Sequence, residues 1–186
     1  MNSRKNFRLL AAAAVLSAFA AGCTHQSSPS AQIDQGFAPF ASSRNQAVGL
    51  VATTKHSLGS ADLNTLAVAY TSLQEKANAY AGFMVEAITT SSFDPARNAK
   101  YAADLQKAIA QFDKAFAPLA PNRQQTIADA WVPSFAQTLQ VRWDQYSGVI
   151  AKMTPQTKAD LIATLKRQTV WPNYEDIATE RVVDTR

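Results

Sequence analysis

The sequence predicts an all-α domain: an antiparallel helical bundle of three long amphipathic helices with a shorter C-terminal helix. Apolar residues recur at alternating steps of three and four along three segments, as on the buried stripe of a helix. Prolines fall between these segments, and short connections favour antiparallel neighbours within one chain. No β-branched alternation is long enough to indicate a strand. The same spacing could also form a coiled coil between chains.

The first predicted elements lie before residue 90. Residues 46–56 are expected to form a short helix. Ser60 has the side chain of an N-cap, and Asp62 places an acid in the first turn of the next helix. That helix, of about 28 residues, has an apolar stripe formed by Leu63, Leu66, Tyr70, Leu73, Ala77, Tyr80, Met84 and Ala87. Residues 89–93 are expected to be a turn.

The second long helix begins at Asp94-Pro95. The aspartate can cap the first turn, and a proline suits the first helical position because its missing N–H has no partner there. Pro118 and Pro121 end the helix. Its stripe is formed by Ala102, Leu105, Ile109, Phe112, Phe116 and Leu119.

The third helical stretch is predicted over residues 123–153. Pro133 should kink this stretch, or split it near Trp131. After the proline the stripe continues through Ala136, Leu139, Trp143, Tyr146, Ile150 and Met153.

The last predicted helix is shorter and begins at Thr154-Pro155. It extends to about residue 168 and is stopped by Trp171-Pro172. Residues 173–186 are polar and charged, and we expect one frayed helix there.

The N-terminus has the layout of an export signal. Arg4, Lys5 and Arg8 form a positive region, and residues 9–21 form an alanine-rich apolar run. This run is too short to span a bilayer, which takes about 20 apolar residues. Ordinary cleavage after Ala18-Phe19-Ala20 and an uncleaved anchor are two interpretations of the segment.

A third interpretation rests on Ala20-Ala21-Gly22-Cys23, which resembles the lipobox of bacterial lipoproteins. In that family the cysteine sulfur receives a diacylglycerol, cleavage follows before the cysteine, and the new amine is acylated. The resemblance covers residues 1–23 and departs from the usual pattern, which most often has leucine where Ala20 stands. It implies a lipid on Cys23. Thr24 in the next position implies transfer to the outer membrane of a Gram-negative envelope.

The cysteine content favours the same interpretation on physical grounds. Cys23 is the only cysteine, so it cannot form a disulfide within the chain, and an odd cysteine in an exported protein needs an explanation. Several acyl chains anchor stably where a single chain binds only marginally. Acylation would also leave the mature protein no free thiol.

The chain is therefore expected to have four regions. They are a signal peptide (1–22), a lipidated N-terminus with a flexible tether (23–45), a helical bundle domain (46–172) and a polar C-terminal tail (173–186). The tether is rich in Ser, Gln and Pro and lacks sustained apolar periodicity. Phe37, Pro39 and Phe40 are the tether residues that could dock onto the bundle.

The basic character of the chain comes mostly from its export signal. The whole chain has 18 basic and 14 acidic residues. Cleavage would remove Arg4, Lys5 and Arg8 and no acid, which leaves 15 basic and 14 acidic residues. No basic excess then remains to indicate a nucleic-acid partner.

The sequence holds little material for catalysis or metal binding. His25 would lie beside the lipid, and His56 falls near a helix end, where it most simply caps carbonyls or faces water. Glu86 is the most apolar-flanked acid, yet helical geometry places it beside the stripe. The acids considered are Asp62, Glu75, Glu86, Asp94, Asp104, Asp113, Asp129, Asp144 and Asp160. Because nucleotide, zinc and nucleophile motifs are absent from the sequence, we predict no enzyme, no cofactor and no metal.

Aromatic residues gather in the last third of the sequence. Trp143 and Tyr146 fall on a helical stripe, which assigns them to the core. Trp171 and Tyr174 stand outside the long helices and are the candidate contacts to a partner protein or to the glycan of peptidoglycan.

The functional prediction is a lipid-anchored structural or adaptor module of the bacterial envelope. It would face the periplasm from the outer membrane, held by its lipid, and bind a protein partner. Secretion into the periplasm is the alternative location. A bundle that binds a small ligand or a glycan is the alternative function, and it would need a cavity lined by rings such as Tyr70, Tyr80 and Trp143.

Overall fold

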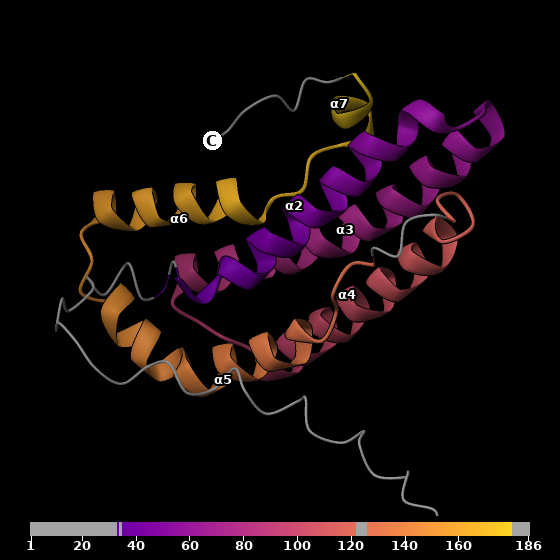
Figure 1. The fold of residues 1–186 in the computed structure, drawn as a ribbon. Helices are drawn as coiled ribbons and strands as arrows, with labels where there is room; N and C mark the ends of the chain where they lie inside the picture. The colour runs from indigo at the N-terminus through magenta and orange to yellow at the C-terminus, as the bar shows by residue number, and fades with distance from the viewer. Residues whose placement is uncertain (1–32, 34, 122–125, 180–186) are drawn as a thin grey trace, which may run out of the picture.

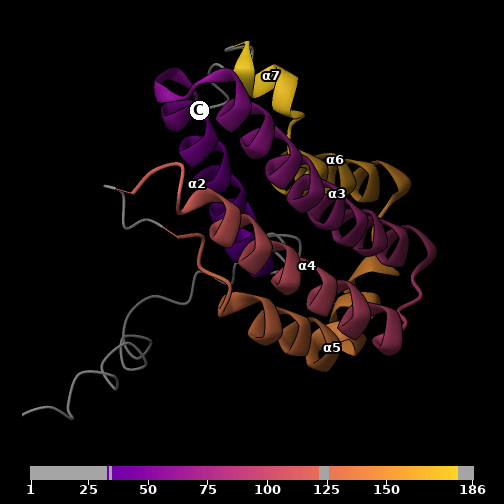
Figure 2. The same cartoon turned by 90° about the vertical axis from the view of Figure 1, so that its right-hand side faces the viewer.

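The computed structural model describes residues 33, 35–121 and 126–179, and in these residues every regular element is helical. The predicted all-α class is confirmed. Figure 1 shows the longer helices side by side, and in Figure 2, turned by 90°, α4 lies between α3 and α5. Within the described part of the chain, no helix has both the length and the apolarity needed to cross a membrane.

The two longest helices form an antiparallel pair. They are α3 (Ser60–Thr90) and α4 (Pro95–Phe116). Asp94 caps α4 as predicted, since its carboxylate accepts hydrogen bonds from the backbone N–H groups of Ala96 and Arg97. The start of α3 differs by one residue: Gly59 occupies the N-cap position, and Ser60 is the first helical residue.

The next two helices are α5 (Trp131–Ile150) and α6 (Pro155–Thr169). Helix α6 opens at Thr154-Pro155 as predicted, and Thr154 caps it, because its hydroxyl accepts the backbone N–H of Thr157. Pro133 neither kinks nor splits a longer helix, because α5 begins at Trp131 and the proline falls in its first turn. The first N–H groups of a helix have no intrahelical acceptor, so a proline costs little there.

The predicted tether ends too late in the sequence. Residues assigned to it begin helix α2 (Ala38–Thr54), which the 3-10 turn η1 (Lys55–Ser57) extends. The buried positions of this region follow helical steps, which are Phe37, Phe40, Ser43, Ala47, Leu50 and Thr54. The buried face of α2 is continuous in the fold. In the sequence its apolar pattern is interrupted, because two of the buried residues, Ser43 and Thr54, are polar.

The predicted C-terminal tail begins too early. The helix expected in this region is present as the short α7 (Tyr174–Ala178), but Ile177 on it is buried in the core. The bundle therefore extends from Ile33 to α7 instead of spanning residues 46–172. The rest of the predicted tail, residues 180–186, lies outside the described residues.

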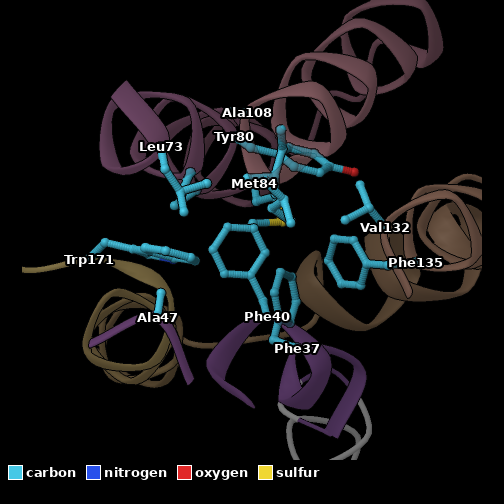
Figure 3. Packing of buried hydrophobic residues seen from close by; sticks show 14 of the residues in the cluster. Phe37, Phe40, Ala47, Leu73, Tyr80, Met84, Ala108, Val132, Phe135 and Trp171 are labelled. Atoms are coloured by element: carbon cyan, nitrogen blue, oxygen red, sulfur yellow. The ribbon is translucent and has the colours of Figure 1, made fainter. Parts of the chain in front are cut away.

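Aromatic rings join α2 to the rest of the bundle. Phe40 is fully buried and meets Tyr80 of α3 and Phe135 of α5 edge to face, with ring centroids 6.0 and 6.2 Å apart. Figure 3 shows Phe37 and Phe40 pointing from α2 into the space between α3, α5 and Trp171. Such pairs add about 0.5–1.5 kcal/mol beyond the burial of their area.

The interior is closely packed at the end where the described chain begins. Ile33 lies there beside Ile88 of α3 and Ile150 of α5, around a space of about 10 Å³. That volume would hold one water molecule at most. The rings expected to line a ligand cavity are used otherwise: Tyr70 and Tyr80 are fully buried, and Trp143 stacks on Phe93 at 4.9 Å.

Replacing Phe40 tests whether α2 belongs to the folded domain. We expect Phe40→Ala to lower the free energy of unfolding by about 3–5 kcal/mol, because it leaves a cavity among three helices. The control is Val141→Ala on α5, where the side chain is 74% exposed and the expected change is within about 0.5 kcal/mol. Urea unfolding of the full chain, followed by circular dichroism, measures both. Equal, small effects would mean that α2 does not share the core.

Candidate functional site

One face of α3 holds the chain segment that follows α6. Tyr70, Gln74 and Asn78 are spaced four residues apart, so their side chains lie in a row along the helix. All three donate hydrogen bonds to the segment 171–173. This row places the segment and the helix α7 that follows it.

Asn78 makes the most specific of these contacts. Its side-chain oxygen accepts the backbone N–H of Trp171 at 2.8 Å, and its amide donates to the carbonyl of the same residue at 3.2 Å. Gln74 donates to the same carbonyl at 3.2 Å and to the side chain of Asn173 at 2.8 Å. The Tyr70 hydroxyl donates to the Pro172 carbonyl at 3.0 Å. An irregular segment thus has its backbone polar groups satisfied by side chains.

Trp171 is a core residue, which corrects its prediction as a surface contact. Its side chain is 1% exposed and packs beside Tyr70, with ring centroids 6.4 Å apart. The sequence suggested exposure because the residue lies next to a proline outside a long helix. In the structure Trp171 is buried because hydrogen bonds from Gln74 and Asn78 of α3 hold its backbone against the bundle.

Helix α7 is held at its other end by Lys55. The Lys55 ammonium donates to the carbonyls of Ile177 (2.7 Å) and Ala178 (3.0 Å), the last two residues of α7. A cation at the C-terminus of a helix satisfies carbonyls that lack intrahelical partners. The lysine side chain is only 8% exposed, so this contact is mostly shielded from water.

An open cleft of about 450 Å³ lies between α7, η1 and the start of α3. It is lined by Lys55, His56, Leu63, Asn64, Ala67, Tyr174 and Ala178. The structure thus places Tyr174, one of the predicted contact residues, at a binding-sized opening. Burial raises the pKa of the Tyr174 phenol, and the negative charge of Glu175 raises it further, so the hydroxyl is a hydrogen-bond donor at neutral pH.

A second groove, of about 400 Å³, lies on the other side of α3, toward α4. Its lining is mostly small or apolar, and it contains Val68, which is 63% exposed. Asn64 lines both the cleft and this groove. The two openings therefore meet across the first turns of α3.

The acids do not converge on the cleft. Glu86 forms a two-pronged ion pair with Arg97, at 2.9 and 2.8 Å, and the hydrogen bond from Arg97 lowers the pKa of Glu86. Asp113 and Asp129 approach each other elsewhere on the bundle. Desolvation raises the pKa of Asp113, and the Asp129 charge adds to this, although the backbone N–H of Ile127 donates to Asp113 and opposes it.

Of the remaining residues considered from the sequence, His56 lines this cleft, and two others fall in the part of the chain that the structure does not describe. Cys23 and His25 lie outside the described residues. His56 is exposed and lines the cleft, at the end of α2 where the sequence placed it. In the described part of the chain, no three residues of His, Cys, Asp or Glu are close enough to hold a metal ion.

Sequence reasoning missed Lys55, Gln74 and Asn78. Gln74 and Asn78 each directly follow a residue of the predicted α3 stripe, at Leu73 and Ala77. Polar side chains at the margin of a buried stripe are the signal that could have singled them out, because such groups need hydrogen-bond partners. Nothing local marks Lys55, whose partners are more than a hundred residues away.

Comparison of the chain with family models, curated proteins and solved structures found no match.

Removing Asn78 should loosen α7. We expect Asn78→Ala to lower the free energy of unfolding by about 1–3 kcal/mol, since both backbone groups of Trp171 lose a partner. Amide hydrogen exchange of residues 170–178 should accelerate more than that of α4. Asn64→Ala makes the same substitution at an exposed position of the same helix, and we expect a change within about 0.5 kcal/mol. Unchanged exchange in the Asn78 variant would contradict the assigned role.

Asp113 should make stability depend on pH. The pKa of this carboxyl is raised in the fold above its ordinary value of 3.8, so the folded state holds a proton that the unfolded chain has already lost. Stability then falls as pH rises from about 3.8 to the raised value and levels off above it. Asp113→Asn lacks this charge, so we expect its stability relative to the original chain to increase from pH 3.5 to pH 7. Urea midpoints across this range measure the difference, and a constant difference would exclude the effect.

Proposed function

We propose that this chain is a lipid-anchored adaptor of the bacterial envelope, held at the outer membrane and facing the periplasm. The observation that carries the proposal is Cys23, the only cysteine, placed directly after a basic region, a short apolar run and Ala20-Ala21-Gly22. The bundle would present a binding surface to an envelope protein and would not act as a catalyst.

The short spacing between Cys23 and the bundle supports a fixed orientation of the bundle relative to the membrane. Only ten residue steps separate Cys23 from Ile33, the first described residue of the core. Even fully extended, they reach at most about 36 Å. The end of the bundle that contains Ile33, Ile88 and Ile150 would therefore stay near the membrane.

The cleft lies at the opposite end of α3. Asn64 at the cleft and Ile88 at the anchored end are 24 residues apart, which is about 36 Å along a helix. In Figure 1, α7 lies beside the start of α3, away from α5. With the proposed anchor, this arrangement would turn the cleft toward the periplasm, where a partner could reach it.

A small-ligand or glycan-binding function is the second candidate. The cleft favours it, because its volume falls within the range of ligand sites and Tyr174 offers a ring on which a sugar could stack. The packed core argues against an interior site, since the space beside Ile33 holds one water at most. A glycan would have to bind at the surface.

Replacing the cysteine tests the anchor. We expect Cys23→Ser to abolish incorporation of a palmitate analogue and to release the protein from membranes, because a serine hydroxyl cannot take part in acyl transfer to sulfur. Ser30→Ala, a change of one atom in the same segment, should keep both properties. Labelling in cells and fractionation of the envelope measure them. A labelled, membrane-bound Cys23→Ser protein would overturn the proposed anchor.

A further inference from the structure

Among the described residues that line it, the cleft beside α7 has two bases and no acid. Lys55 and His56 are its ionisable nitrogen bases, and Asn64 and Tyr174 add an amide and a hydroxyl. The other lining residues, Leu63, Ala67 and Ala178, are apolar. A ligand that is negatively charged and carries a small apolar group matches this combination.

Lys55 is the residue that most strongly favours a negatively charged ligand in the cleft. Its side chain is more than nine-tenths buried, yet among the described residues no carboxylate forms an ion pair with it. Its two hydrogen bonds go to carbonyl oxygens at the end of α7, which forms one wall of the cleft. An ammonium has three donors, and a buried charge is normally paired with an opposite one. Within residues 33–179 as described, two carbonyls are the partners of this ammonium and no carboxylate supplies its counter-charge.

The shape of the surface favours a peptide over a compact small molecule. The cleft continues at Asn64 into the groove between α3 and α4, which is lined mostly by small or apolar side chains, among them the exposed Val68. An extended segment could place a carboxylate at Lys55 and lay the following side chains across α3. A compact ligand would use the first of these two openings alone.

We propose that the cleft binds a carboxylate-bearing peptide segment of an envelope partner, with the carboxylate at Lys55 and apolar neighbours over Ala67 and the α3–α4 groove. This inference rests on the proposed adaptor function and names the chemistry of its partner.

Glu175 provides a test of the charge of the proposed ligand, because removing its negative charge should change the affinity in a predictable direction. Its charge acts on Tyr174 at the rim of the cleft, so it repels an anionic ligand and would attract a cationic one. Glu175→Gln should therefore tighten the binding of an acidic peptide about two- to threefold, as expected for one partly screened surface charge.

The experiment compares two blocked pentapeptides, one with a central glutamate between valines and one with glutamine in its place. They are titrated into the purified full chain in detergent micelles, and binding is followed by NMR shifts of Ala67, Ala178 and Tyr174. We expect the glutamate peptide to bind about tenfold more tightly, which corresponds to about 1.4 kcal/mol for one charge-assisted contact. Lys55→Met should make the two peptides equal.

A second pair of variants keeps the test independent of Lys55, whose loss could also loosen α7. Ala67→Leu fills the cleft and should weaken binding at least tenfold. Ala103→Leu, the same change at an exposed position of α4, should leave it unchanged. Equal affinity for the two peptides, weaker binding in Glu175→Gln, or full binding in Ala67→Leu would each overturn the inference. The chain carrying Cys23→Ser separates it from the anchor, because that variant should bind the peptide normally while failing to label with lipid.

Discussion

The fold depends on covering the whole apolar stripe of α3. This helix has 31 residues, so it is about 46 Å long, and no single neighbour covers it. Helix α4 packs along it, while α6 and α7 cover other parts. Helix α2 reaches it through rings such as Phe40 against Tyr80. Most of the stability of a helix in a protein comes from such packing, so each neighbour contributes to keeping α3 intact.

The apolar stripe of α3 is covered in different ways along its length. One region is filled by packed side chains, and another leaves an open cleft. At the end near Ile33, apolar side chains fill the space almost completely. At the middle of α3, hydrogen bonds from Gln74 and Asn78 hold an irregular segment, and toward the start of α3 Lys55 holds the short helix α7. A helix of five residues cannot fill a long surface, so a cleft remains beside it. The candidate site is therefore a consequence of closing the bundle with a short element.

The sequence predicted the elements whose signals are local. Asp94-Pro95 and Thr154-Pro155 open helices as expected, and the stripe from Leu66 to Ala87 is buried. The helix predicted over residues 46–56 is present, but the first part of α2, residues 38–45, was missed because Ser43 occupies a buried position that an apolar residue usually marks. Of the two predicted contact residues, Tyr174 lines the cleft and Trp171 lies in the core. Their different positions depend on hydrogen bonds from α3, roughly a hundred residues earlier in the chain.

By itself, the sequence determined the all-α class and the starts of two helices, because periodicity and capping act over a few residues. It also supplies the Cys23 signal on which the proposed anchor rests. Only the tertiary structure decided that residues 38–45 belong to the bundle, that Trp171 is buried, and that Lys55, Asn64 and Tyr174 surround one cleft. These results depend on contacts between distant segments. These contacts are the ones that cover the apolar stripe of α3. No local sequence pattern encodes which distant segment packs against which part of that helix.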